Sequence, residues 1–461
     1  MKIIIVGAGT TGWSAAASLS LLKNSSIVVI EPKDIPIIGV GESTIPHINE
    51  FHMKCDLPFY NKEWVDKVNG TLKFGIDFNS FYEKDVSWFH PFFSTRDLAK
   101  DYEECDKLAL ENLESDEYNF VLKHMSHGKK VAKGYVPCDD DFVAYKDGAY
   151  HLDATKYAEV IKEECTKRDN VYLYDSSVKD VVLDDNEHVK HLLMSDGQIL
   201  SGDLYIDCTG FNAILGNKVK TEWTSFSDRL LVDTAIAVQL PHINKEKQLH
   251  NYTYCRGMNA GWSWQIPLQN RNGFGYNFSS RHLTEEEAKE EFKEHLSTFY
   301  GYEKNDIKFR TIKYQTGVRK ESWKNNVLCL GLSSFFVEPI EATGIATTHN
   351  MILQLRTLLN SPHIKIENKI KRYNQLLEDS MYCILEYIEM HYSLTDREDT
   401  AFWKFYKEKK NSEVQQKILD VHIESKISEN VLKRILPMSN IFGHAAWVFQ
   451  FEGAEVKNTY K

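Results

Sequence analysis

The chain has 461 residues, of which 42% are hydrophobic and 26% charged, so it can bury a large core in two packed domains or one enlarged domain. A net charge of −11 argues against nucleic acid as a partner, and no apolar run is long enough to span a bilayer. The eight cysteines and 17 histidines lack the C-x-x-C, H-x-x-x-H and H-E-x-x-H spacings, so no metal is expected.

The first predicted strand, residues 3–6, begins almost at the start of the chain, which leaves no cleavable signal and predicts a cytoplasmic protein. Gly7, Gly9 and Gly12 follow in the G-x-G-x-x-G spacing, and residues 13–22 predict an amphipathic helix. Gly7 permits a tight turn, Gly9 lets the backbone approach a pyrophosphate, and Gly12 lets the helix pack against the strand. Free N–H groups at the helix start can bind phosphate.

A second strand, residues 27–30, ends in Glu31. A carboxylate at this position accepts hydrogen bonds from an unphosphorylated ribose, such as that of FAD or NAD. Strand, glycine turn, helix, strand and acidic residue occur in the required order. The opening segment therefore predicts a dinucleotide-binding site.

The later segments complete an α/β fold. In chain order we expect a helical region at 51–70, a half-buried strand at 71–82, a helix-prone insertion covering the site at 98–130, a helix at 154–165 capped by Asp153, and strands at 171–182, 189–194 and 204–207. Alternating apolar positions over 231–282 predict an antiparallel sheet over a substrate cavity. We expect a dinucleotide-binding domain interleaved with this sheet and the insertion at 1–345, and a helical C-terminal subdomain at 346–461.

Trp262 and Trp264 lie two residues apart in an apolar segment, residues 261–267. Residues two apart on a strand share a face, so the two indoles are expected side by side. On this pattern alone, a pair of core aromatics is the better interpretation.

Lys73 interrupts the apolar residues Leu72, Phe74 and Ile76. Such a lysine either extends its ammonium group to solvent or lies in a cavity where its reactivity is used. The pattern favours the first alternative and leaves the second open.

The run from Phe336 to Ile345 leads into a predicted helix. Thr343 and Gly344 there can form a small anion site at the helix start, and Glu341 just before them is a candidate base. The alternative is an ordinary helix entry with acidic residues near the positive end of the helix dipole.

Together these segments resemble the flavin-dependent tryptophan halogenase family, from Lys2 to about Phe451. The resemblance is carried by the W-x-W-x-I-P motif at 262–267 together with Gly-Val-Gly-Glu-Ser-Thr-Ile-Pro at 39–46, Tyr-His-Leu-Asp-Ala at 150–154, Ile-Asp-Cys-Thr-Gly-Phe at 206–211 and Pro-Ile-Glu-Ala-Thr-Gly-Ile at 339–345. It implies a Rossmann-like FAD-binding domain of the flavin monooxygenase type.

The resemblance also implies the cofactor and its supply. A separate NADH-dependent reductase would deliver FAD as FADH2, which with O2 and halide yields hypohalous acid. The implied FAD contacts are Gly7, Ala8, Gly9, Thr10, Thr11, Gly12, Glu31, Pro32, Ile35, Glu42, Ser43, Val178, Leu332 and Ile345. Halide would be held near Thr343 and Gly344, and Trp262 and Trp264 would form a barrier in a tunnel between flavin and substrate.

Lys73 and Glu341 match the catalytic residues of the family. Lys73 would donate a hydrogen bond to hypohalous acid, or form a haloamine if its amine is neutral, and burial favours neutrality. Glu341 would polarise the electrophile and assist proton removal from the ring. His90 and Phe92 match a segment that sandwiches the aromatic substrate and so selects the carbon that reacts.

The chain departs from the tryptophan-specific members of the family. Glu338 stands where Asp is usual and Ala342 where Ser is usual, and residues 427–453 lack the paired tyrosines that cover free tryptophan. The chain is also short and rich in lysine and asparagine, which resembles compact marine or phage-borne members. We therefore expect a more open pocket for indoles, phenols or anilines. Iodide and bromide are oxidised more easily than chloride, so we expect them to be used more readily.

Two other functions stay open on the sequence. A flavin monooxygenase would hydroxylate the arene and would need no reserved lysine, and a catalytically idle flavin-binding protein would need neither Lys73 nor Glu341. The expected partners are the reductase and a small aromatic substrate, with no membrane, and the sequence leaves room for a homo-oligomer.

Overall fold

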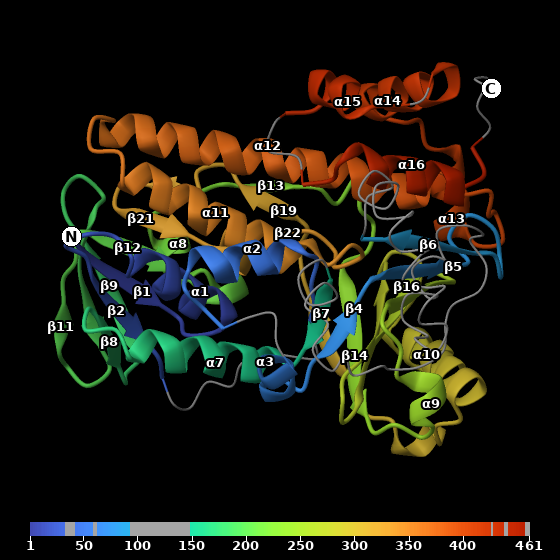
Figure 1. Cartoon of the computed structure of the whole chain (residues 1–461), viewed down its shortest axis with the longest axis horizontal. Coiled ribbons are helices and arrows are strands. Elements are labelled where there is room, and N and C mark those ends of the chain that lie inside the picture. The colour runs from blue at the N-terminus through green and yellow to red at the C-terminus, as the bar shows by residue number, and fades with distance from the viewer. Residues whose placement is uncertain (33–41, 59–61, 93–147, 426, 438–440, 457–461) are drawn as a thin grey trace, which may run out of the picture.

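The computed structural model describes residues 1–32, 42–58, 62–92, 148–425, 427–437 and 441–456, so Ile35 and the predicted insertion at 98–130 lie outside the described residues. Two large sheets lie at opposite ends of the molecule, and the long helix α12 (Ile366–Ser393) extends from the first toward the second (Figure 1). Among the described helices, none combines the length and the apolar composition needed to cross a bilayer.

The first large sheet has the strand order β20-β21-β12-β1-β2-β8 and is parallel except for β20. Its central strands are continuous apolar runs because both faces of the sheet are buried. Helices cover one face, and the strands β9 (Val178–Leu183) and β10 (Val189–Met194) pack against the other. Helix α1 packs between α7 and α11. The bounds are β1 Lys2–Val6, β2 Ser26–Ile30, β8 Val171–Tyr174, β12 Leu204–Asp207, β20 Trp323–Lys324, β21 Val327–Cys329, α1 Thr10–Leu19, α7 Ala154–Thr166 and α11 Thr343–Leu359. The predicted Rossmann-like opening is confirmed, and Asp153 caps α7 as expected.

The second large sheet has the order β18-β14-β17-β16-β15-β5-β6. Its four central strands pair antiparallel, as predicted for residues 231–282, but β5 joins β15 in parallel. An early segment of the chain thus enters a sheet that is otherwise built from later residues. The bounds are β5 Gly75–Asn79, β6 Ser87–Pro91, β14 Thr234–Leu240, β15 Thr253–Met258, β16 Gly261–Pro267, β17 Asn272–Phe278 and β18 Arg310–Lys313.

The single strand predicted at 71–82 is wrong, because the chain divides at Phe74. Residues Thr71–Lys73 form β4, which pairs with β7 (Ala149–Leu152) in a small sheet completed by β3 (Glu42–Ser43). The Phe74 N–H donates to the carbonyl of Asn251 instead, at 2.8 Å, and the next residue begins β5. Both strands are fully buried, so burial on the two faces replaces the alternation of a half-buried strand.

The remaining elements are short or surround these sheets. The helical region predicted at 51–70 contains two helices, α2 (His47–Lys54) and α3 (Lys62–Lys67). The others are β9 Val178–Leu183, β10 Val189–Met194, β11 Ile199–Leu200, β13 Trp223–Ser225, β19 Gly317–Arg319, β22 Phe335–Phe336, α8 Ile214–Lys218, α9 Lys245–Gln248 and α10 Glu285–Tyr300. Every described element after Ala342 is a helix: α11, α12, α13 (Ala401–Glu408), α14 (Glu413–Glu424), α15 (Glu429–Ile435) and α16 (His444–Gly453).

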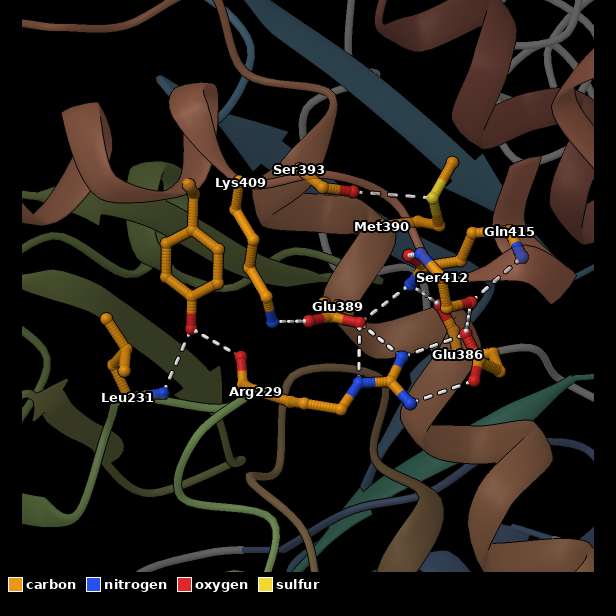
Figure 2. A network of polar contacts seen from close by, with 10 residues as sticks. Arg229, Leu231, Glu386, Glu389, Met390, Ser393, Lys409, Ser412 and Gln415 are labelled. Atoms are coloured by element: carbon orange, nitrogen blue, oxygen red, sulfur yellow. Dashed lines mark hydrogen bonds and ion pairs between the residues drawn. The ribbon is translucent and has the colours of Figure 1, made fainter.

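A buried ionic network joins these C-terminal helices to the loop before β14 (Figure 2). The Arg229 guanidinium donates to Glu386 at 2.8 Å and to Glu389 at 2.9 Å, both on α12. Lys409 also pairs with Glu389, and Gln415 on α14 donates to the same carboxylate at 2.9 Å. Two acidic side chains are thus held one turn apart inside the protein by cations from other elements.

We expect Arg229→Met to lower the free energy of unfolding by about 3 kcal/mol, because its removal leaves the buried Glu386 without a cation and Glu389 with Lys409 alone. Arg229 and the two glutamates are largely buried, so solvent screens them little. Urea unfolding followed by circular dichroism measures the change. Lys404→Met, in an exposed pair with Glu408, is the control and should leave the midpoint unchanged. Equal midpoints for both variants would contradict this account.

Candidate active site

A cavity with a volume of about 1010 Å³ is lined by residues from both large sheets. The residues expected to contact FAD converge on it from distant parts of the chain. Those that line the cavity are Gly7, Ala8, Gly9, Thr10, Thr11, Glu31, Pro32, Glu42, Ser43, Val178, Leu332 and Ile345. Gly12 lies behind the turn, and Ile35 is outside the described residues.

The glycine turn has the geometry that a pyrophosphate requires. Gly7 has a φ of +102°, a conformation that favours glycine, and a Cβ atom on Gly12 would lie 1.9 Å from the Gly7 carbonyl oxygen. By contrast, a Cβ atom on Gly9 would meet no atom within 4 Å, so the backbone is open to the cavity there. Close packing at Gly12 and open backbone at Gly9 fit a bound dinucleotide such as FAD.

Glu31, the expected ribose ligand, forms an ion pair with Lys162 of α7. Both side chains line the cavity. The ion pair uses Oε2 of Glu31, so Lys162 orients the carboxylate at the end of β2. Sequence analysis did not identify Lys162, because the helix that carries it follows more than a hundred residues later in the chain.

The predicted anion site lies at the first residues of α11. Thr343 is buried, and its hydroxyl has no hydrogen-bond partner among the described residues. Gly344 lines the cavity, and a Cβ atom there would meet nothing within 4 Å. Ala342 before them has a φ of +55°, an uncommon conformation for alanine. Unpaired N–H groups of a helix start and a buried free hydroxyl together offer donors to an anion.

Trp262 and Trp264 lie side by side on β16, as predicted, with ring centroids 5.8 Å apart. Both line the cavity and both are buried. The Trp262 Nε1–H donates to Glu338 at 3.0 Å, and the hydroxyl of Tyr392 on α12 donates to the same carboxyl oxygen. Burial raises the pKa of Glu338 to about 8, although these two hydrogen bonds oppose the shift. A neutral buried acid therefore holds the Trp262 indole.

Lys73 does not reach solvent: its side chain is 0% exposed, so the solvent-directed interpretation is wrong. Its Nζ donates to the Thr44 carbonyl at 2.9 Å and lies 4.6 Å from the centre of the Phe92 ring. Burial lowers the pKa of Lys73 to about 7, and the nearby Glu341 carboxylate opposes this shift. An amine with this pKa exchanges between its neutral and charged forms at physiological pH.

Glu341 is fully buried and is held by two imidazoles. His90 Nδ1 lies 3.0 Å from each carboxylate oxygen, and His391 Nε2 lies 2.8 Å from Oε1. Burial alone would raise the pKa of Glu341, but the His90 and His391 contacts outweigh it and hold the pKa well below its usual range. The result is a carboxylate that stays ionised and whose charge acts on Lys73.

The expected substrate residues His90 and Phe92 lie beside this pair. Their rings meet edge to face with centroids 6.1 Å apart, and the Phe449 ring of α16 is 6.2 Å from His90. Phe92 also packs against a small apolar cluster that contains Ile45 and Ala342. Aromatic and aliphatic side chains thus pack around Lys73 and Glu341.

The sequence interpretation missed His391, Gln450 and the Thr44 carbonyl. His391 occurs in a segment that matches the family, but nothing local shows that it contacts Glu341, fifty residues earlier. Gln450 is an ordinary position of a C-terminal helix until the fold brings it to His391. Only the tertiary structure brings His391 and Gln450 to the site.

Comparisons with known proteins agree with this geometry. The tryptophan halogenase family profile matches residues 2–458. The tryptophan 6-halogenase SttH of Streptomyces toxytricini is 30% identical over 429 residues, which cover 87% of this chain and 80% of SttH. The tryptophan 7-halogenase RebH of Lentzea aerocolonigenes is 30% identical over 450 residues, which cover 91% of this chain and 81% of RebH.

Comparison with solved structures indicates the same family. A flavin-dependent halogenase from Xanthomonas campestris superposes with a TM-score of 0.82 at 26% identity, covering 100% of this chain and 90% of that chain. The match extends over the FAD-binding Rossmann-like region and the helical C-terminal region alike. Because the family profile and the relatives span nearly the whole chain, it belongs to the tryptophan halogenase family of flavin-dependent oxidoreductases.

Proposed function

We propose that this enzyme halogenates an electron-rich aromatic compound of the indole, phenol or aniline type, using reduced FAD, O2 and halide. The observation that carries the proposal is the complete burial of Lys73 and Glu341, whose charges interact, with Glu341 between two residues that line the dinucleotide cavity. A buried lysine with a lowered pKa and a buried ionised carboxylate are each energetically unfavourable. Neither is needed to bind a flavin.

The residues that line the cavity would hold FAD, with Gly9 at the pyrophosphate and Glu31 at the ribose. Bound reduced flavin would supply, with O2 and halide, the oxidising equivalents that produce hypohalous acid. Donors at Thr343 and Gly344 would hold the halide. A separate NADH-dependent reductase would supply the reduced flavin.

Lys73 would receive the hypohalous acid and present it to the substrate. As an ammonium it donates a hydrogen bond to the oxygen, which makes the halogen more electrophilic. As a neutral amine it attacks the halogen, so that the nitrogen–halogen bond of a haloamine forms while the oxygen–halogen bond breaks and water leaves with the amine proton. Glu341 would take the proton that the ring loses when the carbon–halogen bond forms. The rings of His90 and Phe92 would hold the arene so that one carbon faces Lys73.

The Trp262 and Trp264 pair would keep the arene away from the flavin. This separation favours halogenation over direct hydroxylation. Indoles, phenols or anilines are favoured over free tryptophan, because residues 427–453 lack paired tyrosines that could grip an ammonium and a carboxylate.

Mass spectrometry of a substrate panel tests the proposal. The enzyme is incubated with a flavin reductase, FAD and NADH, with bromide or without halide. A product heavier by one bromine, absent without bromide, supports halogenation. A gain of one oxygen in both samples would instead establish a monooxygenase, and no product on any electron-rich arene would favour an idle flavin-binding protein.

The halide order is a separate prediction. We expect iodide and bromide to be used faster than chloride on one substrate, because their oxidation is easier. Parallel assays at equal halide concentration measure the three rates. Chloride as the fastest halide would contradict the prediction and would indicate a selective anion site.

The glycine turn gives a third prediction. Gly12→Ala should weaken FAD binding at least about 100-fold, because the new Cβ overlaps the Gly7 carbonyl and displaces the turn or the helix. Fluorescence titration with FAD measures the affinity. Gly210→Ala is the control: this glycine also lines the cavity, but a Cβ atom there would meet no atom within 4 Å, so only its positive φ opposes alanine. Equal losses in both variants would contradict the close-packing argument for Gly12.

A further inference from the structure

A buried amide completes the hydrogen-bonded group around Glu341. Gln450 of α16 is 1% exposed, and its Nε2 lies 2.6 Å from His391 Nδ1. The other ring nitrogen of His391, Nε2, is the one that contacts Glu341, at 2.8 Å. Two successive contacts thus connect the site to the C-terminal helix, from Glu341 through His391 to Gln450.

From these contacts we propose that Gln450 is a positioning residue that orients His391, and through it the Glu341 carboxylate, in either protonation state of the imidazole. The inference rests on the proposed function of Glu341. It gives α16 a role at the site.

The amide has the chemistry for both states. With Nε2 of Gln450 facing the ring, its N–H donates to His391 Nδ1, which leaves the ring proton on the nitrogen that faces Glu341. Rotation of the amide by half a turn places Oε1 at the same position, where it accepts from a protonated Nδ1. Oε1 now has no hydrogen-bond partner among the described residues, whereas Nε2 also donates to the Tyr387 carbonyl at 3.2 Å, so the rotation gives up that one contact. A protonated Nδ1, which lies 3.2 Å from the same carbonyl, can then donate to it.

Few other groups can influence His391. Glu341 faces it from the turn before α11 and His90 lies behind that carboxylate on β6. On its own helix, the Tyr387 carbonyl lies 3.2 Å from Nδ1, and burial and Glu341 raise the pKa of the Tyr387 hydroxyl. From the second large sheet, the rings of Phe78 and Trp88 pack against His391. Gln450 is therefore the polar side chain that contacts Nδ1.

Two substitutions at this position test the two parts of this role. Gln450→Glu can only accept and adds negative charge, so it should keep the doubly protonated imidazole to a higher pH than in the wild type. Gln450→Met has a similar shape but no hydrogen-bonding group, so it leaves Nδ1 without its side-chain partner in both protonation states and should shift the titration less than Gln450→Glu does. Heteronuclear NMR of enzyme with ¹⁵N-labelled histidine measures both shifts directly.

Turnover gives the second readout. Gln450→Met should lower kcat about 10-fold at unchanged KM for the arene, because Glu341 loses its orientation and not its charge. Gln415→Met is the matched control: Gln415 is equally buried and also bonds to α12, but to Glu386 and Glu389 away from the site.

The proposal is overturned if both Gln450 variants titrate His391 as the wild type does, or if Gln450→Met and Gln415→Met lose kcat equally. The NMR titration needs no turnover. A wild type that halogenates no substrate would therefore refute the proposed function, while the titration would still decide the role of Gln450.

Discussion

Replacing Lys73 by methionine is expected to lower the halogenation rate by about 10²–10⁴-fold and to leave FAD binding unchanged. Methionine fills a similar volume, but it can neither donate a hydrogen bond to hypohalous acid nor form a haloamine. Lys73 does not line the dinucleotide cavity, so flavin affinity should not change. Product formation by mass spectrometry and FAD titration by fluorescence measure the two effects. Retained halogenation would remove Lys73 from the mechanism.

The same variant should be more stable than the wild type near neutral pH, by on the order of 3 kcal/mol. The pKa of Lys73 is about 7 in the folded protein against 10.5 when unfolded, so the unfolded state binds more protons between these values. The free energy of unfolding of the wild type should therefore rise with pH from 7 to 10.5. Below pH 7 the folded protein carries the full free-energy cost of burying the Lys73 ammonium. Urea unfolding at several pH values measures this rise. In Lys73→Met the free energy of unfolding should rise less with pH over this range, because the titrating amine is gone.

The pH dependence of the rate separates the two uses of the amine. If the neutral amine forms a haloamine, the rate should rise through pH about 7, and if the ammonium donates a hydrogen bond, it should fall over the same range. A rate profile on one arene at saturating halide decides between them.

Glu341→Gln is the second substitution with a large expected effect, a loss of about 10²–10³-fold in kcat with little change in KM. An amide cannot take the proton from the ring, and its NH2 group would face the donors of His90 and His391. Steady-state kinetics with reduced flavin in excess measures both constants.

Glu338→Gln is the matched comparison, because it lies three residues earlier and is equally buried. Burial raises the pKa of Glu338 to about 8, so an amide resembles its neutral form, whereas Glu341 is held ionised. We expect a clearly smaller loss of kcat for Glu338→Gln. Equal losses would show that packing of the 338–341 turn, and not the charge of Glu341, limits the rate.

Local sequence patterns predict much of the fold. The strand, glycine turn, helix and second strand of the opening segment were predicted within a few residues, because hydrophobic periodicity and glycine spacing act over short distances. The division of 71–82 into two strands was not predicted. It depends on Asn251, which offers its carbonyl to Phe74 from a distant part of the chain.

The candidate site shows the same limit. The residue types at positions 73 and 341 could be selected from the sequence through the family resemblance. The protonation states of these two side chains could not be predicted. His90 and His391, which keep Glu341 ionised, come from β6 and α12. Gln450 carries no local signal at all.

By itself, the sequence determined the dinucleotide turn and the family, because Gly7, Gly9, Gly12 and Glu31 lie within one βαβ unit whose geometry follows from near neighbours. Only the tertiary structure decided that Lys73 is buried. A pKa depends on solvent exclusion and on nearby charge, and the Thr44 carbonyl, the Phe92 ring and the Glu341 carboxylate meet around Lys73 only when the chain has folded.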